Sequence, residues 1–390
     1  MLANNSKKIY LDNAATTKTD KRVLEAMAPY LSEFYGNASS LHSFGTYAKE
    51  SLEIFRSKLA GFLNVQSDEI VFTSGGTEAN NFALKGIAFA NRSKGNHIIV
   101  SAIEHDCILN TCKWLETQGF FVTYLPVDKN GAIDLDFLKR CINPKTIFVS
   151  VMHVNNEIGT IQPVSEIGKI CKERGVYFHS DACQSFGKIP IDMQNINLLT
   201  INSHKIYGPK GVGALIIKKG TNIIPMFHGG GQESGLRSTT ENIAGIAGFV
   251  KATELCFLEM ENEKKRISRL QKKIITNLKD NIDGVYFNGD LNHRLPHNIN
   301  FCISGLEGES IRLLLLLDEQ GIAVSSGSAC SSNGDNSASH VLQAIGLNQF
   351  EARGSIRISL GRYNTENEID IFLETIKSNI KNLNSIFSKV

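Results

Sequence analysis

The sequence predicts an α/β protein whose large domain contains a mostly parallel, seven-stranded sheet and is joined to a smaller α+β domain. Between about residues 70 and 217, short β-rich runs alternate with helical stretches, which is typical of β-α-β units. Several runs are continuously apolar, as in strands that are buried on both faces of a parallel sheet. The predicted strands lie in EIVFT, NHIIVS, FFVTYL, TIFVSVM, VYFHSD, LLTINS and GALIIK.

Helical periodicity lies between these strands and after them. The expected helices of the large domain are 78–90, 108–118, 135–142 and 165–174. A long, charged amphipathic helix at about 253–281 is interpreted as the bridge to the second domain. The segments VYFNGD, HNINFCIS, a leucine-rich helix, GIAVSS, SIRISL and a terminal helix predict the smaller unit. We therefore expect a large domain of residues 16–255 and a small domain formed by residues 1–15 and 256–390.

The composition excludes several classes of protein. The chain has 390 residues, of which 42% are hydrophobic and 21% are charged, so neither a fibrous nor an extensively disordered protein fits. The 41 basic residues nearly cancel the 39 acidic ones, which gives no long-range field to attract nucleic acid or an anionic membrane. The one dense leucine run, 313–317, is far shorter than the roughly 20 residues of a membrane-spanning helix. Direct partners among nucleic acids and membranes are therefore not expected.

The cysteines indicate a reducing compartment. Eight cysteines are too few for a disulfide scaffold in so long a chain, and no C-x-x-C pair predicts a metal site or a thioredoxin-like motif. The N-terminal segment has no apolar stretch of signal-peptide length. We therefore expect a cytoplasmic protein.

A glycine-rich turn opens the first predicted helix of the large domain. A strand that ends at Thr73 is followed by SGGT at 74–77 and then by a helix. Glycines allow a sharp turn, and the amides of the first helical turn together with the Thr77 hydroxyl form a cup that suits phosphate. The same pattern is also a common way to start a helix without any ligand.

An acid and a lysine follow two neighbouring predicted strands. Asp181, in FHSDACQS, lies at the carboxyl end of a buried strand, where open α/β sheets bind ligands. Lys205, in TINSHKIYGPKGVG, lies at the end of the next strand. A lysine in such a place is usually exposed to solvent, but this one could instead bind a carbonyl cofactor as an imine. A lysine imine, an acid for a ring nitrogen and a phosphate cup are the arrangement of enzymes that use pyridoxal 5'-phosphate (PLP).

A cysteine and an arginine are further candidates in the second half of the chain. Cys330 lies in AVSSGSACSSNGDNSASH, a composition that predicts an exposed loop. From the residues alone it is either a nucleophile or an incidental cysteine. Arg357, in GSIRISLGR, projects from a predicted strand and could hold a substrate carboxylate bidentately. Arg362 is the alternative for that role.

Taken together, the motifs resemble those of a known family. YLDNAATT, SGGTEANN, EHDCILNTC, MHVNNEIG, HSDACQ, SHKIYGPKG, HGGGQESGLRSTTEN, SSGSAC and SIRISLGR occur in order over nearly the whole chain. They are similar to the cysteine desulfurases of the NifS/IscS-like class, within the class V aminotransferase group and PLP fold type I. The chain departs from the family pattern at Asn202, where serine is frequent, and at Ser234 and Thr239, where arginine and glycine are usual. These departures concern phosphate geometry and a dimer-facing loop.

The resemblance implies a role for each site residue. Lys205 would bind PLP as an imine, Asp181 would pair with the pyridine nitrogen, and Gln184 would bond the ring hydroxyl oxygen. His105 would stack on the ring and assist proton transfer. The implied cofactor-binding set is Gly76, Thr77, His105, Asn156, Asp181, Gln184, Ser203, His204, Lys205 and Thr240. The last of these would come from the neighbouring subunit, so a homodimer is implied.

The implied reaction is the removal of sulfur from L-cysteine. Asn156 and Arg357 would hold the substrate carboxylate, and Cys330 would take the sulfur as a persulfide while alanine is released. No resident metal is implied, although Cys330 would transiently ligate an iron-sulfur cluster. A sulfur-acceptor or iron-sulfur scaffold protein would be the partner, and iron-sulfur cluster assembly ranks before tRNA thiolation and DNA phosphorothioation.

Two other functions remain open from the sequence. A selenocysteine lyase or another PLP-dependent β-lyase would use the same cofactor site without a persulfide on Cys330. A catalytically silent scaffold partner would keep the fold without the reaction, although Lys205 beside Asp181 and Gln184 argues against it.

Overall fold

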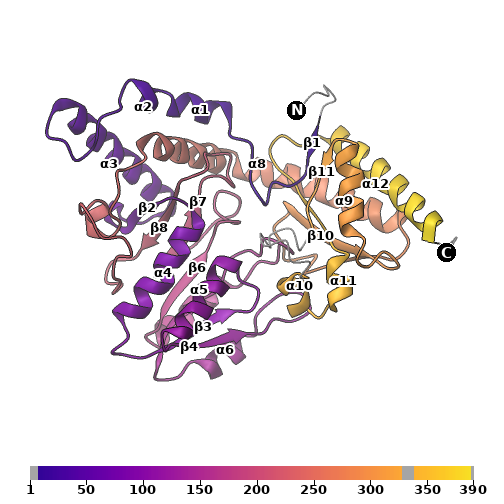
Figure 1. The fold of residues 1–390 in the computed structure, drawn as a ribbon, viewed down its shortest axis with the longest axis horizontal. Coiled ribbons are helices and arrows are strands. Elements are labelled where there is room, and N and C mark those ends of the chain that lie inside the picture. The colour runs from indigo at the N-terminus through magenta and orange to yellow at the C-terminus, as the bar shows by residue number, and fades with distance from the viewer. Residues whose placement is uncertain (1–7, 327–337, 388–390) are drawn as a thin grey trace.

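The described part of the protein contains a seven-stranded sheet and a three-stranded sheet, which a long helix joins, and a separate pair of short strands (Figure 1). The structure is a computed structural model that describes residues 8–326 and 338–387. Cys330 and the rest of residues 327–337, the central part of the loop predicted around it, lie outside the described residues.

All seven strands predicted for the large sheet are formed. They are β2 (Ile70–Thr73), β3 (His97–Ser101), β4 (Phe121–Leu125), β5 (Thr146–Ser150), β6 (Tyr177–Asp181), β7 (Leu198–Asn202) and β8 (Gly213–Ile217). Their order across the sheet is β2-β8-β7-β6-β5-β3-β4. Strand β8 runs antiparallel to both of its neighbours, whereas the other pairs are parallel. The predicted mostly parallel, seven-stranded sheet is confirmed.

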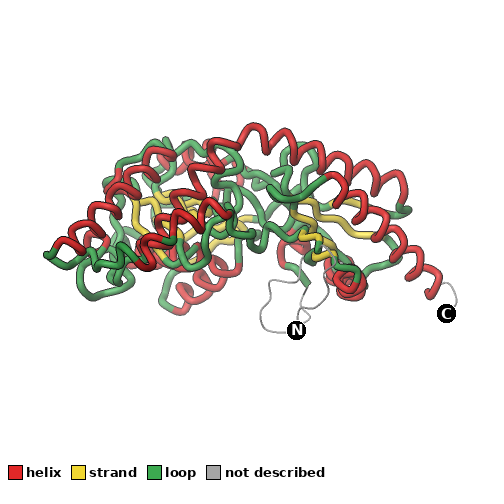
Figure 2. The backbone as a smooth tube through the Cα atoms, turned by 90° about the horizontal axis from the view of Figure 1, so that it is seen from above, coloured by secondary structure: helices red, strands yellow, loops and turns green. Residues whose placement is uncertain are grey.

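Helices cover both faces of this sheet (Figure 2). They are α1 (Lys21–Met27), α2 (Pro29–Ser32), α3 (Ser43–Leu63), α4 (Gly76–Ala90), α5 (Asp106–Thr117), α6 (Leu135–Cys141) and α7 (Val164–Glu173). Apolar side chains of α4 and α5 pack on one face, and those of α3, α6 and α7 pack on the other. Helices α4 to α7 lie within two residues of their predicted bounds. Because helices cover both faces of the sheet, its strands are buried on both faces.

Helices α1 to α3 occupy a part of the chain for which the sequence pattern predicted no element. On α3, apolar side chains lie on both the buried and the exposed sides, and Phe44 and Ile54 are more than half exposed. The buried positions of α3 recur every three to four residues, but they include Ser51 and Arg56, so burial and apolar character do not coincide along the helix. Packing against α8 (Ile243–Asn281) holds α3 and α1 in place instead.

Helix α8 begins ten residues before its predicted start at 253. Every residue of its first eight, IAGIAGFV, is buried, so this part has no polar face from which an amphipathic pattern could be recognised. The side chain of Asn242 caps the helix by accepting a hydrogen bond from the Gly245 amide at 3.0 Å. The second half of α8 contributes Ile267 and Ile274 to the core of the small unit. Figure 1 shows α8 reaching from the large sheet to the small one.

The small unit is built on an antiparallel sheet with the order β12-β10-β9. Its strands and helices are β9 (Val285–Phe287), β10 (Asn298–Ile303), α9 (Ser310–Glu319), α10 (His340–Ala344), α11 (Gln349–Arg353), β12 (Ile356–Ser359) and α12 (Glu366–Phe387). Near the start of the chain, β1 (Ile9–Tyr10) pairs in parallel with β11 (Ile322–Ala323). The limits predicted for the two domains, at 15/16 and 255/256, stay a prediction.

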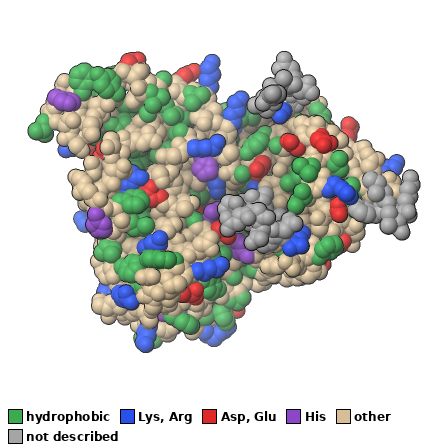
Figure 3. Space-filling model, viewed as in Figure 1, with side chains coloured by type: hydrophobic (Ala, Val, Ile, Leu, Met, Phe, Trp, Pro, Cys, Tyr) green, Lys and Arg blue, Asp and Glu red, His purple; other side chains and the backbone are tan. Residues whose placement is uncertain are grey.

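The surface agrees with the balanced charge of the sequence. On the face shown in Figure 3, Lys and Arg side chains are interspersed with Asp and Glu. Within the described ranges, no helix combines the length and the apolar character needed to cross a bilayer.

Candidate active site

A cavity of about 230 Å³ lies where the carboxyl ends of β6 and β7 meet the N-terminus of α4 and strand β12 of the small sheet. Eight of the predicted site residues line it: Gly76, Thr77, His105, Asn156, Asp181, His204, Lys205 and Arg357. They come from motifs spread over most of the chain. The fold thus brings together the phosphate cup, the acid, the lysine and the arginine that the sequence singled out separately.

Asp181 is a buried carboxylate held by two hydrogen bonds. The backbone amide of Cys183 donates to Oδ1 at 2.8 Å, and the side-chain amide of Asn80 donates to Oδ2 at 2.7 Å. Burial by itself raises the pKa of this carboxyl, but the hydrogen bonds from Cys183 and Asn80 together with the charge of Lys205 outweigh burial, and the pKa lies below its ordinary value. Asp181 is therefore an anion at neutral pH, suited to a protonated ring nitrogen.

Lys205 presents an amine to the same cavity. Among the described residues, no hydrogen bond or ion pair engages its Nζ atom, although the residue is only partly exposed. The preceding His204 contacts the Thr16 hydroxyl through Nδ1 at 3.2 Å. Burial, and then the charge of Lys205, lower the pKa of His204 to about 4, so this ring is neutral. An unengaged amine next to an ionised acid can form an imine with a carbonyl compound.

The turn before α4 has the features of a phosphate cup. Gly75 has φ 152°, and in the described part of the chain no side chain caps the N-terminus of α4. A Cβ atom on Gly76 would lie 2.7 Å from the Cys183 sulfur, so a larger residue would fill the cradle. Asn202 also lines the cavity, and its side-chain Nδ2 atom, 3.6 Å from the position of that Cβ atom, is a hydrogen-bond donor without a partner among the described residues. Helix amides and an amide side chain are donors that fit a phosphate group.

The ring of His105 is fixed by the helix that it caps. Its Nδ1 atom accepts a hydrogen bond from the Cys107 amide at 3.1 Å. Burial, and then the charge of Lys205, lower the pKa of His105, so the ring is neutral. Because Nδ1 is an acceptor in the neutral ring, Nε2 carries the proton. The ring therefore presents an N–H donor at Nε2.

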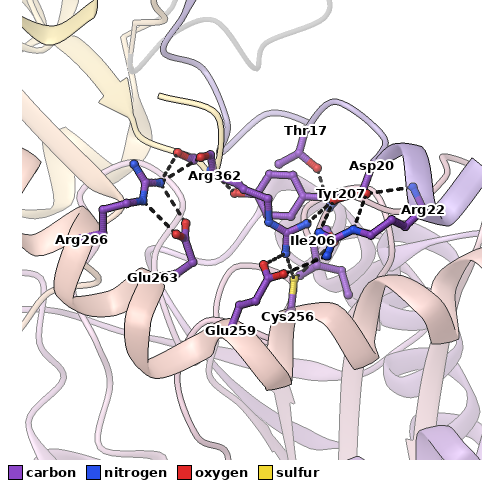
Figure 4. A network of polar contacts seen from close by, with 11 residues as sticks. Thr17, Asp20, Arg22, Ile206, Tyr207, Cys256, Glu259, Glu263, Arg266 and Arg362 are labelled. Atoms are coloured by element: carbon purple, nitrogen blue, oxygen red, sulfur yellow. Dashed lines mark hydrogen bonds and ion pairs between the residues drawn. The ribbon is translucent and has the colours of Figure 1, made fainter. Parts of the chain in front are cut away.

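Arg357 occupies the place predicted for a carboxylate clamp. It projects from β12, is 1% exposed, and donates to Asp12 Oδ1 at 2.8 Å and to the Asn156 carbonyl at 3.1 Å. Arg362, the alternative, does not line the cavity and is engaged in a separate network (Figure 4). Of the two arginines, Arg357 is therefore the one that lines this cavity, and its role toward a substrate carboxylate stays a prediction.

Four predicted site residues are not among those that line the cavity. Gln184 lies next to it and donates from Nε2 to the carbonyl of Ala14, a lining residue, at 3.0 Å. The hydroxyl of Ser203 is buried without a partner among the described residues and lies against Gly208. Thr240 lines a second cavity, of about 170 Å³. Cys330 is outside the described residues.

Sequence reasoning missed several residues of the site. Asn80 is 1% exposed on α4 and reaches both Asp181 and the Cys107 sulfur, the latter at 3.2 Å. Its place four residues after Gly76, one helical turn further on, was the available signal. Asp12 lies in YLDNAATT, a segment in which no residue by itself indicated a catalytic or binding role. Its pairing with Arg357 joins residues too far apart in the chain for a local pattern.

Comparisons with known proteins agree with this geometry. The model of the family Aminotransferase class-V matches residues 9–372. A curated relative from Dictyoglomus turgidum, named cysteine desulfurase IscS, is 50% identical over 382 residues, which is 97% of this chain and 96% of that protein. The chain therefore belongs to the aminotransferase class-V family, and the family predicted from its motifs is confirmed.

Solved structures give the same result. A structure named NifS-like protein has a TM-score of 0.90 and 39% identity, and the match covers 96% of this chain and 100% of the other. A structure of SspA in complex with cysteine has a TM-score of 0.81 and 37% identity, and the match covers 92% and 100%. The predicted PLP fold type I architecture is shared with these proteins.

The bond from Asn80 to Asp181 can be tested through stability. Asn80→Ala leaves Oδ2 of a buried carboxylate without its donor, and we expect the free energy of unfolding at neutral pH to fall by about 1–3 kcal/mol. Because the folded-state pKa of Asp181 is depressed, its stabilisation is present above the ordinary value of 3.8 and is lost as the pH falls through the folded-state pKa. The deficit of the variant should therefore shrink in acid. Urea unfolding at several pH values measures it, and an equal deficit at every pH would show that only packing is lost.

Proposed function

We propose that this protein is a PLP-dependent cysteine desulfurase that releases L-alanine from L-cysteine and passes the sulfur, as a persulfide on Cys330, to an acceptor protein. The observation that carries the proposal is the amine of Lys205, which no described residue engages, in one cavity with the ionised carboxylate of Asp181 and the cup at the N-terminus of α4. The relative named cysteine desulfurase IscS and the cysteine complex of SspA support the same substrate.

The residues around the cavity suit PLP. Lys205 would bind its carbonyl carbon, and Asp181 would pair with its ring nitrogen. Gly76 and Thr77, with His204, would receive the phosphate. Gln184 and Ser203 would complete the cofactor contacts from beside the cavity, as the family resemblance implies. When bound, PLP supplies an electron-poor ring that stabilises negative charge on the substrate α-carbon.

Two protein groups would handle protons. The Nζ atom of Lys205 would take the α-proton of the substrate, because the amine is the unengaged base in the cavity. His105, with its proton on Nε2, would assist the proton transfer as a hydrogen-bond donor.

The substrate carboxylate would bind at Arg357 and Asn156. Arg357 already donates to Asp12, so an incoming carboxylate would use the remaining guanidinium hydrogens, including Nε, which lacks a partner among the described residues. Asp12 would hold the guanidinium plane in place. Burial raises the pKa of Asp12 and the charge of Arg357 lowers it, with burial dominant.

The sulfur transfer balances without an added oxidant. The thiol of Cys330 and L-cysteine give a Cys330 persulfide and L-alanine: the S–S bond forms, the carbon–sulfur bond breaks, and its electron pair and a proton remain with carbon. Cys330 is oxidised to the persulfide level as the substrate carbon is reduced. A thiolate is the reactive form, and a reducing cytoplasm would preserve it.

A homodimer and an acceptor protein complete the proposal. Thr240 lies on a loop that the Arg237–Glu78 ion pair, at 2.7 Å, ties to the first turn of α4. We propose that Thr240 reaches the phosphate site of a second copy. Iron-sulfur cluster assembly is the favoured destination of the sulfur, before tRNA thiolation and DNA phosphorothioation.

Replacing the lysine tests the cofactor assignment. Lys205→Ala should abolish the yellow absorbance of the purified protein and lower alanine formation by more than about 1,000-fold, because both cofactor attachment and the base are lost. Visible spectra and an alanine assay measure these effects. A colourless wild-type protein would favour the catalytically silent scaffold.

Replacing the cysteine tests the persulfide. Cys330→Ala should still bind PLP and change its absorbance on addition of L-cysteine, but it should no longer turn over. Cys302→Ala is the control, because Cys302 is buried in β10, outside the cavity residues. Full retention of cysteine desulfuration in Cys330→Ala would instead indicate a β-lyase or a selenocysteine lyase.

The departure at Asn202 gives a matched pair of variants. Asn202 lines the cavity and its side-chain Nδ2 atom, which faces Gly76, can donate a hydrogen bond to an anion, whereas the Ser203 hydroxyl lies against Gly208. We expect Asn202→Ala to weaken PLP binding by about tenfold, as for the loss of a bond to a charged group, and Ser203→Ala to have a smaller effect. Equilibrium dialysis against PLP measures both. The reverse order would restore Ser203 as the main phosphate donor.

A further inference from the structure

Arg362 forms the centre of a network beside the active-site cavity (Figure 4). Its guanidinium donates to Asp20 Oδ2 at 2.7 Å and pairs with Glu259 Oε2 at 2.9 Å. The same group lies 4.3 Å from the centre of the Tyr207 ring, and the backbone amide of Arg362 donates to the Tyr207 hydroxyl at 2.7 Å. Arg362 thus contacts Tyr207 twice, through its charge and through its backbone.

Tyr207 has a backbone conformation that needs support. It follows Lys205 by two residues and has φ 67°, a left-handed conformation that is costly for a residue with a large side chain. The residue is only 7% exposed. Such a conformation persists where the surroundings enforce it, and it often occurs at functional sites.

Hydrogen bonds hold the backbone of this turn on several sides. The amide of Tyr207 donates to the Thr17 hydroxyl at 2.7 Å, and its carbonyl accepts from the Asp20 amide at 2.9 Å. The amide of Thr17 also donates to the His204 carbonyl at 2.8 Å. The thiol of Cys256 contacts the Ile206 carbonyl at 3.5 Å. The residues that flank Lys205 are therefore fixed on both sides.

Arg362 is itself held firmly in place. Arg266 on α8 donates to the carbonyls of Gly361, Arg362 and Asn364 at 2.9, 3.1 and 2.6 Å. The side chain of Arg362 is 11% exposed, so solvent screens its ion pairs only weakly. The network therefore links the segment after β12, helix α8, the start of α1 and the turn that carries Lys205.

We propose that Arg362 is a positioning residue for Lys205: it holds the ring and hydroxyl of Tyr207, and so keeps the turn at 204–207 in the conformation that directs the amine into the cavity. The inference rests on the proposed function of Lys205, and it assigns a role to Arg362, which does not line the cavity. Losing the contacts to Tyr207 would let the left-handed residue relax and would shift the lysine that precedes it. Misplacement of a catalytic group by about 1 Å can cost about 100-fold in rate.

The test compares three variants of the holoenzyme. Arg362→Gln removes the charge and the stacking on Tyr207, and Tyr207→Phe keeps the ring but removes the hydroxyl. Arg22→Gln is the matched control, because Arg22 bonds the same two carboxylates, Asp20 and Glu259, but its side chain is 47% exposed and no contact with Tyr207 is recorded in the described structure.

Three readouts separate positioning from stability. They are the visible circular dichroism of bound PLP, which reports a fixed orientation of the chromophore, the rate of PLP release to a scavenging apoenzyme, and the melting temperature of the PLP-free protein. For Arg362→Gln we expect weaker dichroism, faster release and a fall in kcat of about 10- to 100-fold with a smaller change in KM. Tyr207→Phe should show smaller changes in the same directions, and Arg22→Gln should match the wild type in dichroism and release.

Each outcome either supports or contradicts the positioning role of Arg362. Dichroism and PLP release in Arg362→Gln that equal those of Arg22→Gln would overturn it, even if the melting temperature falls. If Arg362→Gln does not fold, Tyr207→Phe decides: unchanged dichroism and release overturn the proposal, and altered values support it. A wild-type protein that binds no PLP would instead refute the proposed function, which distinguishes the two failures.

Discussion

The ionised carboxylate of Asp181 at the end of β6 is the constraint around which the site is arranged. A buried charge is costly unless hydrogen bonds compensate for it, and here the Cys183 amide and Asn80 supply them. The neighbouring thiols of Cys107 and Cys183 stay neutral, because burial and then the charge of Asp181 raise their pKa. The carboxylate of Asp181 therefore remains the anion of this site, and it shares the cavity with the amine of Lys205 from the turn after the adjacent strand β7.

At Arg357, the cavity is formed where the large unit and the small unit meet. Arg357 comes from β12 of the small sheet, whereas Asn156, whose carbonyl it contacts, belongs to the large unit. Asp12 comes from the N-terminal segment, which bridges to Ser359 at the end of β12. The placement of the small unit through α8 and through this segment therefore sets where a substrate carboxylate would bind. The proposed clamp on Tyr207 belongs to the same junction.

Much of the large unit could be predicted because its signals are local. Strands buried on both faces are continuously apolar, and the Gly-Gly turn before α4 announces a helix start. The early part of α8 and helix α3 were missed for the opposite reasons: the former is buried on all sides, and the latter exposes apolar residues such as Phe44. In the early part of α8 there is no polar face, and on α3 polar residues are buried while apolar ones are exposed, so in both the pattern of apolar residues does not report which positions are buried.

For the site, the sequence by itself determined which chemical groups are present: an amine at Lys205, an acid at Asp181 and a glycine turn before α4. Their types and their places at strand ends are local properties of the chain. Only the tertiary structure decided which groups meet. It placed Arg357 rather than Arg362 in the cavity, paired Arg357 with Asp12, and supplied Asn80 as the partner of Asp181. These choices depend on contacts between segments far apart in sequence, which no local pattern records.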